Sequence, residues 1–334
     1  MHQYDIRDLR IHFPTRRGVV EAVRGVSFYM DQGECVALVG ESGCGKSVTA
    51  RSLMGLTEVT GGRCQPGSQI LCHGENILDY SKKQWQSYRG REAAMIFQDA
   101  MTSLNPTMQI GHQIAECYRF HQKIGRKEAL EKAAEMLALV GISDPETALR
   151  RYPHEFSGGM RQRVMIASAL ACQPELLIAD EPTTALDVTI QAQILDMMKK
   201  LRDERGSSML MITVLLISHD MGVVAGLAQR IVILYAGCVM EAGTTDEIFY
   251  QPAHPYTRGL QKASPRLDEM GGGRLYTIEG VVPNLLHLPE GCRFCTRCEC
   301  ATERCFVEMP ELYETAEGHR VRCFLSEEVA EDGK

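Results

Sequence analysis

The feature that most constrains this chain of 334 residues is a glycine-rich segment that directly follows a short apolar run. The run Cys35-Val36-Ala37-Leu38-Val39 predicts a buried parallel strand, because strands covered on both faces are apolar throughout. The residues that follow, Gly40 to Ser47, fit the pattern G-x-x-x-x-G-K-[ST], which joins such a strand to the start of a helix. The sequence therefore predicts a strand, a tight loop and a helix, which together open an α/β fold.

The chemistry of this loop suits a bound triphosphate. Glycines let backbone N–H groups close around the phosphates, and the helix N-terminus adds positive potential. Lys46 is expected to bridge the β- and γ-phosphates, and the Ser47 hydroxyl is expected to ligate Mg²⁺. The residues expected to bind the nucleotide here are Gly40, Ser42, Gly43, Cys44, Gly45, Lys46, Ser47 and Val48.

A second apolar run ends in two carboxylates. Residues 176–179 predict another buried strand, and Asp180 and Glu181 follow it directly. Alone, an acidic pair at a strand end is as often a solvated surface feature as a functional site. Behind a phosphate-binding loop, Asp180 is expected to hold Mg²⁺ through water, and Glu181 is expected to polarise the attacking water as a general base. The two motifs together predict a P-loop NTPase.

The remaining pattern predicts how the core is organised. Strand patterns fill the first 50 residues, and charges alternate with Ala and Leu at helical spacing over residues 107–150. Further buried strands fit part of 209–217 and residues 231–234. Apolar residues at helical spacing over 190–201 predict a helix that ends near Gly206. Strands that alternate with helices predict an α/β domain with a mainly parallel sheet.

The character of the sequence changes near residue 250, where Pro and Gly become frequent. We therefore expect an ATPase domain over residues 1–250, with a helical subdomain at about 100–170. A C-terminal extension is expected over residues 251–334.

Composition excludes some classes of function. The formal net charge is −7, so the chain has no global basic field for nucleic acid. Its longest apolar run, residues 209–217, is far shorter than the about 20 residues of a membrane-spanning helix. The N-terminal residues carry charges where a signal peptide has its apolar stretch. We expect the chain to stay in the compartment where it is made, with any membrane spans supplied by other chains.

A third motif makes the family recognisable. Phe-Ser-Gly-Gly-Met at residues 156–160 resembles the signature motif of ATP-binding-cassette (ABC) ATPases, whose common form is Leu-Ser-Gly-Gly-Gln. Its Ser157, Gly158 and Gly159 precede a helical stretch, which gives a second helix N-terminus for phosphate. Met160 in place of Gln is a mild departure, because Ser157 and backbone amides make most of the phosphate contact. In the family, ATP lies between the P-loop of one cassette and the signature of another.

The resemblance assigns further roles, residue by residue. Gln98 resembles the Q-loop glutamine that senses Mg²⁺ and water, Asp187 the D-loop aspartate, and His219 the switch histidine at the γ-phosphate. Phe13 is equally plausible as an adenine-stacking ring and as part of the core. About five residues look inserted before His219, because Ser-His follows an unusually long strand pattern. Such an insertion would either displace His219 or lengthen the loop before the strand.

A narrower resemblance covers nearly the whole chain. The stretches at residues 95–106, 179–194 and 254–257 are similar to the oligopeptide, dipeptide and nickel branch of ABC importers. This implies an α/β ABC ATPase core with an antiparallel β subdomain, a helical insertion and a small Cys-rich extension. It also implies ATP and Mg²⁺ as ligands and an ATPase activity that drives uptake of peptides or a related solute.

The same resemblance implies partners. They are a second ABC ATPase subunit, expected to be a sister chain, two transmembrane permease subunits and, indirectly, an extracytoplasmic solute-binding protein. The chain is then peripheral, on the cytoplasmic face of the cell membrane. Import of nickel or another non-peptide solute is an alternative, as is a soluble ABC ATPase that acts on nucleic acid or ribosomes. One cassette and no sustained heptads disfavour the latter. A non-catalytic regulatory cassette is disfavoured by the intact Lys46, Asp180, Glu181 and Ser157.

Six of the 13 cysteines fall between residues 292 and 323, and without a secretion signal such a cluster more often indicates metal than disulfides. The family resemblance implies a [4Fe-4S] cluster. Zinc and free or oxidised thiols stay open as alternatives, because two further cysteines, Cys295 and Cys300, lie among the expected ligands. The ligands that the resemblance implies are Cys292, Cys298, Cys305 and Cys323.

Overall fold

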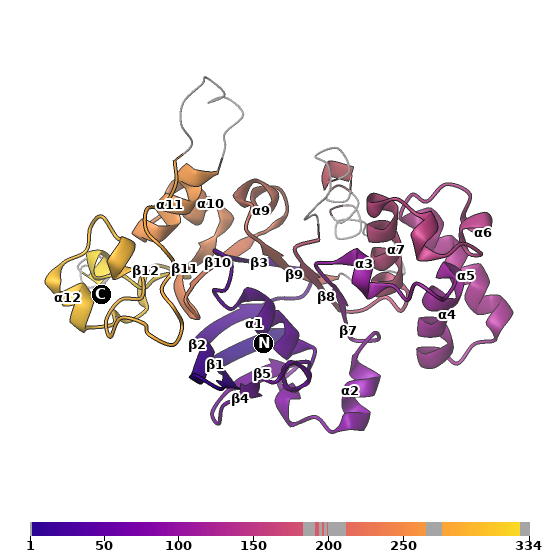
Figure 1. Ribbon diagram of the computed structural model, residues 1–334, viewed down its shortest axis with the longest axis horizontal. Coiled ribbons are helices and arrows are strands. Elements are labelled where there is room, and N and C mark those ends of the chain that lie inside the picture. The colour runs from indigo at the N-terminus through magenta and orange to yellow at the C-terminus, as the bar shows by residue number, and fades with distance from the viewer. Residues whose placement is uncertain are drawn as a thin grey trace, which may run out of the picture. The chain divides into compact units, whose positions relative to one another are not determined.

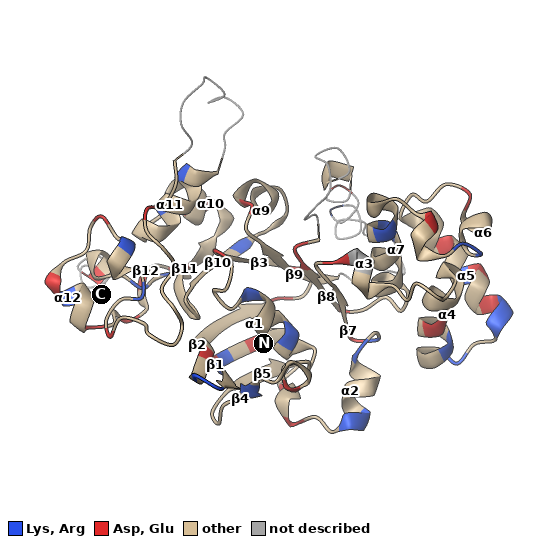
Figure 2. Ribbon diagram, viewed as in Figure 1, with Lys and Arg blue, Asp and Glu red and all other residues tan. Residues whose placement is uncertain are grey.

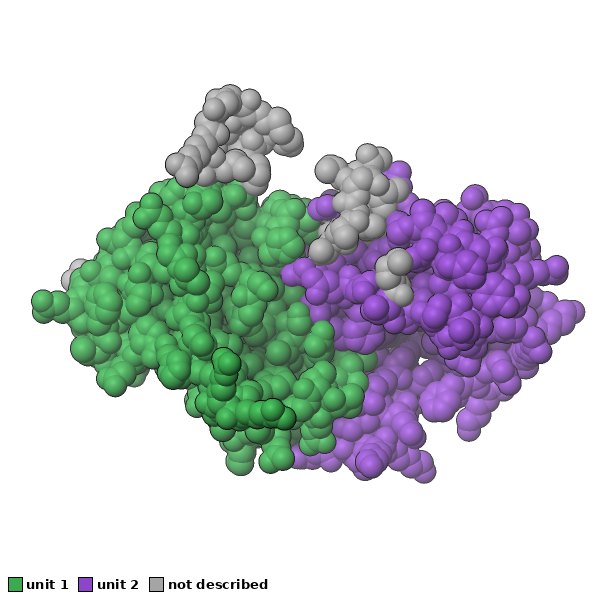
Figure 3. All heavy atoms as spheres, in the orientation of Figure 1, with its two compact units in different colours: residues 1–31, 35–78, 217–334 green, residues 32–34, 79–216 purple. Residues whose placement is uncertain are grey.

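The apolar run before the glycine-rich loop forms strand β3 (Cys35–Val39), which is buried at every position, as expected. The structure is a computed structural model that describes residues 2–182, 191–193, 196, 199, 212–264 and 276–327 (Figure 1). The chain forms two compact units, shown in different colours in Figure 3. Unit 1 comprises residues 1–31, 35–78 and 217–334, and unit 2 comprises residues 32–34 and 79–216.

Unit 1 contains an antiparallel sheet built on a long hairpin. Apolar residues at near-alternate positions of the first strand, such as Tyr4, Ile6 and Leu9, are fully buried, so one face of the hairpin lies in the core. The strand order is β2-β1-β5-β6, with β4 also paired to β1. The bounds are β1 (Tyr4–Thr15), β2 (Gly18–Met30), β4 (Arg63–Cys64), β5 (Gln69–Cys72) and β6 (Glu75–Asn76).

A second sheet of unit 1 joins the core to the C-terminal extension. Strand β3 pairs in parallel with β10, and the order within this unit is β12-β13-β11-β10-β3. Strands β12 and β13 come from the extension, so the extension adds strands to the sheet. The strands are β10 (Arg230–Tyr235), β11 (Cys238–Thr244), β12 (Tyr313–Ala316) and β13 (His319–Val321). The helices of unit 1 are α1 (Lys46–Leu53), α9 (Met221–Leu227), α10 (Thr245–Tyr250), α11 (Pro255–Ala263) and α12 (Glu303–Val307).

Unit 2 contains the expected helical segment and a parallel strand pair. Strand β7 pairs in parallel with β8, and β9 lies on the other side of β8. Figure 2 shows acidic and basic residues interleaved along α5, as on most solvated helix faces. The strands are β7 (Ala93–Ile96), β8 (Leu176–Asp180) and β9 (Thr213–Ser218). The helices are α2 (Lys82–Tyr88), α3 (Ala100–Ser103), α4 (Ile110–His121), α5 (Arg126–Leu139), α6 (Pro145–Ala148) and α7 (Gly158–Leu170).

The buried strands predicted at 35–39, 176–179, within 209–217 and at 231–234 all form. Most of the helix predicted over 190–201, and residues 208–211 of the suspected insertion, lie outside the described part of the chain. Among the helices that the structure describes, none combines the length and apolar character that a bilayer span requires.

A buried ion pair fastens the extension to the sheet. His319 Nε2 of β13 lies 2.8 Å from Glu241 Oε1 of β11, and Glu241 is fully buried. The same carboxylate accepts hydrogen bonds from the backbone amides of Ala253 and His254. Burial alone raises the pKa of Glu241, but the bonds from His319 and these amides leave that pKa below its ordinary value. The bond to Glu241 raises the pKa of His319, although burial opposes the shift.

We expect His319→Gln to lower the free energy of unfolding by about 1–3 kcal/mol at about pH 6. The raised pKa of His319 means that its contribution is complete below its ordinary value of 6.5 and is lost as the pH rises through the folded value. The lowered pKa of Glu241 means that its contribution is present above 4.5 and is lost on acidification. Denaturant titrations of the wild type and the variant should therefore show a smaller difference at about pH 8.5 than at about pH 6.

The matched control is His2→Gln. The pair of His2 with Asp31 is equally short, at 2.7 Å, but both side chains are about half exposed, so the substitution should change stability by less than about 1 kcal/mol. A loss in His319→Gln that does not depend on pH would contradict the charge contribution of the pair.

Candidate nucleotide-binding site

The glycine-rich loop holds its lysine in place. Lys46 opens α1 and is 5% exposed. Its Nζ donates hydrogen bonds to the carbonyls of Gly40, at 2.6 Å, and Glu41, at 3.0 Å. These two hydrogen bonds hold the ammonium group against the loop backbone, so an anionic ligand would meet a fixed positive charge there.

Two glycines are required by close backbone packing. Gly40 has φ +153°, and a Cβ there would lie 2.1 Å from the carbonyl oxygen of Leu234 on β10. Gly45 has φ +102°, and a Cβ there would lie 2.7 Å from the carbonyl oxygen of Ala22 on β2. Any side chain at either position would displace the loop from these strands.

The other loop residues differ in exposure. Ser42 and Gly43 are exposed, and Ser47 and Val48 are half-buried in the first turn of α1. Cys44 is buried with its Sγ 3.8 Å from Lys46 Nζ, and burial raises the pKa of its thiol. Ser42 and Gly43 are thus the most accessible residues of the loop.

In unit 2, the carboxyl ends of two paired strands bring three predicted residues together. Asp180, the last residue of β8, is 1% exposed. Glu181 follows with φ +48°, a left-handed conformation that is uncommon for residues other than glycine and that concentrates at functional sites. Gln98, which lies just after the neighbouring strand β7, donates from Nε2 to Glu181 Oε2 at 2.8 Å. A glutamine amide is therefore in place to orient the carboxylate expected to act as the base.

Also in unit 2, Ser157 caps helix α7. Its hydroxyl accepts a hydrogen bond from the amide of Met160 at 3.4 Å. Ser157 and Gly158 are exposed, and a Cβ at Gly158 would meet no atom within 4 Å. The start of this long helix is open, as a surface that binds an anion from outside must be.

Three further predicted residues lie elsewhere. His219 in unit 1 is exposed directly after β9, and Asp220 beside it caps α9 by accepting from the amide of Gly222 at 2.8 Å. Phe13 on β1 is half-buried, with its ring against the backbone at Gly62. Asp187 lies outside the described residues.

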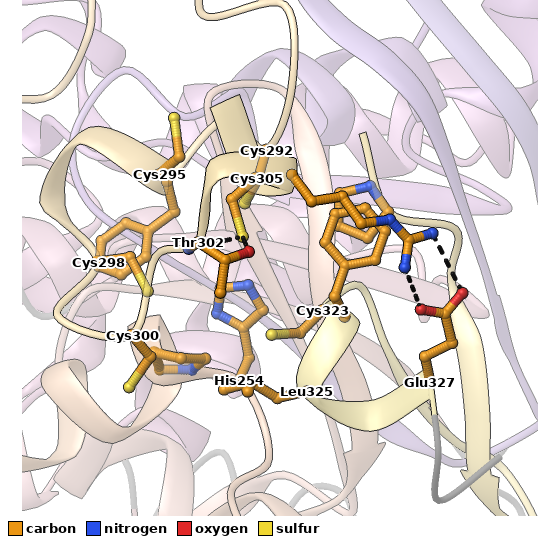
Figure 4. A pocket seen from close by; sticks show the side chains of 15 residues that line it. His254, Cys292, Cys295, Cys298, Cys300, Thr302, Cys305, Cys323, Leu325 and Glu327 are labelled. Atoms are coloured by element: carbon orange, nitrogen blue, oxygen red, sulfur yellow. Dashed lines mark hydrogen bonds and ion pairs between the residues drawn. The ribbon is translucent and has the colours of Figure 1, made fainter. Parts of the chain in front are cut away.

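The C-terminal cysteines line one pocket of about 270 Å³ in unit 1, together with His254 (Figure 4). We call it the thiol pocket, and its cysteines are Cys292, Cys295, Cys298, Cys300, Cys305 and Cys323. Burial and the neighbouring thiols raise the pKa of Cys292 to about 12. All four expected ligands therefore face a common pocket, and thiols are the right donor chemistry for an iron–sulfur cluster. However, no three metal-ligating side chains in the described part of the chain are arranged to hold a metal ion.

Sequence reasoning missed two side chains that contact the loop. Arg297 of the extension forms an ion pair with Glu41, and the hydroxyl of Tyr256 accepts a hydrogen bond from the Glu41 amide. Both lie more than 200 residues from the loop in the sequence, where local patterns carry no signal of the contact.

Comparison with known proteins gives this geometry its context. Residues 23–184 match the ABC transporter family, and residues 240–305 match the oligopeptide/dipeptide transporter C-terminal region. The oligopeptide transport ATP-binding protein OppD of Bacillus subtilis (strain 168) is 49% identical over 321 residues, which cover 96% of this chain and 88% of that protein. The chain belongs to the ABC transporter ATP-binding subunits of the oligopeptide/dipeptide branch. The predicted family is thereby confirmed, and the chain is an ABC ATPase.

Other comparisons agree. The dipeptide transport ATP-binding protein DppD of Lactococcus lactis subsp. cremoris (strain MG1363) is 47% identical, over 96% of this chain and 90% of that protein. The solved dimeric structure of the bacterial ABC transporter cassette MJ0796 superposes with a TM-score of 0.63 at 24% identity, covering 72% of this chain and 98% of that one. This likeness confirms the predicted fold class.

The close packing of the loop can be tested with Gly40→Ala. Because the new Cβ would clash with a backbone carbonyl at a left-handed position, we expect a destabilisation of about 1–3 kcal/mol. We also expect loss of nucleotide binding. Thermal unfolding and titration with Mg-ATP would measure the two effects.

Gly226→Ala is the matched control, since a Cβ in this turn of α9 meets open space. It should be neutral or stabilise by up to about 1 kcal/mol. Unimpaired nucleotide binding by Gly40→Ala would contradict the proposed packing requirement.

Proposed function

We propose that this protein is the ATP-hydrolysing subunit of an importer for dipeptides or oligopeptides. The observation that carries the proposal is similarity to peptide transport ATP-binding proteins along 96% of the chain, including its C-terminal extension. An intact set of phosphate-loop, carboxylate and signature residues supports an active ATPase rather than a regulatory cassette.

We propose a task in hydrolysis for each of these groups. Lys46 exchanges a loop carbonyl for the β- and γ-phosphate oxygens of bound ATP. Ser47 and Asp180, with Gln98, are the residues that would hold Mg²⁺, which neutralises charge on the phosphates. Glu181 accepts a proton from the attacking water, and its hydrogen bond to Gln98 orients it for that transfer. His219, which directly follows β9, would contact the γ-phosphate.

The exposed start of α7 requires a partner. A helix N-terminus capped by Ser157, with open space at Gly158, suits the triphosphate bound to a second cassette. We propose that this second cassette is a sister ATPase subunit and that Asp187 lies beside the shared nucleotide. The pair would then drive two transmembrane permease subunits at the cytoplasmic face of the membrane, with solute delivered by an extracytoplasmic binding protein. Closure on ATP and opening after hydrolysis form a two-state equilibrium biased by the ligand.

Glu181→Gln is the decisive variant. It keeps the shape and hydrogen bonding of the side chain but removes the base, so ATP binding should persist while turnover falls by at least about a hundredfold. The assembled complex should accumulate with ATP trapped between closed cassettes. Phosphate release and size-exclusion chromatography with ATP would measure both.

Lys46→Ala is the complementary control and should lose nucleotide affinity itself. Unchanged ATPase activity in Glu181→Gln would exclude Glu181 as the base. Uptake of labelled peptide, compared with labelled nickel, by cells that express the complete transporter distinguishes the solutes.

We further propose that the thiol pocket holds a [4Fe-4S] cluster through Cys292, Cys298, Cys305 and Cys323. The supporting observation is that all four line one pocket. Burial raises the pKa of Cys298 to about 11. Because thiolates are the ligands of such a cluster, loading would require the ligating thiols to lose their protons. A bound cluster would cross-link the segments of the extension, and we assign it a structural role.

Anaerobically purified protein should contain about four iron and four sulfide ions per chain and show a brown absorption band. Cys298→Ser and Cys305→Ser should lose most of the iron, whereas Cys64→Ser, a half-buried cysteine of unit 1, should keep it. A colourless protein with one zinc ion per chain would overturn the cluster in favour of a zinc site.

A further inference from the structure

An arginine of the Cys-rich extension binds an acidic residue inside the phosphate loop. Arg297 Nη1 lies 2.6 Å from Glu41 Oε2, and Arg297 Nη2 lies 3.1 Å from Glu41 Oε1. The contact is thus a two-bond fork, the strongest geometry available to this pair. The Arg297 side chain is only 3% exposed and that of Glu41 is 29% exposed, so solvent screens the pair weakly.

Arg297 is held in position independently of Glu41. Its Nε donates to the carbonyl of Glu279 at 3.0 Å, and Nη2 donates to the carbonyl of Ile278 at 3.2 Å. The guanidinium also lies beside the rings of Tyr235 and Phe294. The extension therefore presents a fixed positive charge to the loop, at small cost in side-chain entropy.

A second contact joins the backbone of Glu41 to the C-terminal extension. Its amide donates to the hydroxyl of Tyr256 at 2.9 Å, and Tyr256 is fully buried at the start of α11. The carbonyl of Glu41 in turn accepts from Lys46 Nζ at 3.0 Å. Glu41 therefore contacts both the extension and Lys46, the lysine that is expected to bind the phosphates.

The negative charge of Glu41 disfavours binding of a triphosphate to the loop that contains it. A carboxylate in a loop built for a triphosphate repels that ligand, because like charges in a partly buried site interact strongly. Arg297 supplies the compensating charge and also turns the carboxylate toward the extension. Without Arg297, the carboxylate would be free to approach the phosphates.

We propose that Arg297 is a positioning residue for nucleotide binding. It neutralises Glu41 and, with Tyr256, fixes the loop conformation that presents Lys46, so the C-terminal extension sets the affinity of the cassette for Mg-ATP. This inference rests on the proposed nucleotide site. It gives the extension a task in the ATPase that does not require the thiol pocket to be loaded.

Arg297→Met should weaken binding of a non-hydrolysable Mg-ATP analogue to the full chain by about tenfold, within the range of coupling between contacting groups. The KM for ATP of the assembled complex should rise in parallel, whereas kcat should change by less than about twofold, since the hydrolytic residues are untouched. Calorimetric titration and steady-state phosphate release measure the two quantities.

The second substitution tests the electrostatic cause. Adding Glu41→Gln to Arg297→Met removes the unneutralised carboxylate, so affinity should recover to within about threefold of the wild type. Arg297→Lys, which keeps the charge but loses the fork, and Tyr256→Phe, which keeps the ring, should each cost about threefold. These milder variants keep the proposal testable if Arg297→Met fails to fold.

Arg322→Met is the matched control. Arg322 is a half-buried arginine of the same extension whose bonds go to the carbonyls of Val239 and Pro310 instead of the loop. It should lower stability and leave nucleotide affinity within about twofold. Equal affinity in Arg297→Met and the wild type, or no recovery on adding Glu41→Gln, would overturn the proposal. Failure of the proposed function is separate, because it would appear as absent turnover in the wild-type complex.

Discussion

The contact of the phosphate loop with the backbone of two neighbouring strands is the constraint on which the site depends. Gly40 packs against the carbonyl of Leu234, and Gly45 against that of Ala22. With no room for Cβ atoms, only glycines allow the loop to follow this path, along which two of its own carbonyls accept hydrogen bonds from Lys46. The parallel pairing of β3 with β10 places Gly40 beside Leu234. The position of the Lys46 ammonium group thus follows mainly from the backbone geometry of the loop.

The core and the site could be predicted from sequence where the signal is local. Wholly apolar runs gave the buried strands because parallel strands are covered on both faces. The same runs located Lys46, Asp180 and Glu181, since loops at the carboxyl ends of such strands carry the chemistry. The hydrogen bond between Gln98 and Glu181 follows from the parallel pairing of β7 with β8, which aligns the ends of two strands far apart in sequence.

What could not be predicted depends on contacts with no local pattern. Arg297 stands between two cysteines, and its sequence context suggests only a neighbour of a metal ligand, whereas its partner is Glu41. His319 likewise has no periodic signal, yet its bond to Glu241 joins β13 to β11. The left-handed backbone of Glu181 is a tertiary outcome too, because the intrinsic preference of glutamate opposes it. The peptide branch could be predicted only from longer stretches, at residues 95–106, 179–194 and 254–257, and the comparisons confirmed it.

The pairing of β13 with β11 has a consequence for any shortened form of this protein. Glu241 and Ala242 of β11 pair with Val321 and Arg320 of β13, so the extension covers the edge of β11. Cutting the chain near residue 250 would expose that edge, with its unpaired backbone donors and acceptors. It would also leave Glu241 without its counter-charge. Exposed strand edges pair with other polypeptide chains. A minimal cassette cut near residue 250 would therefore be prone to self-association.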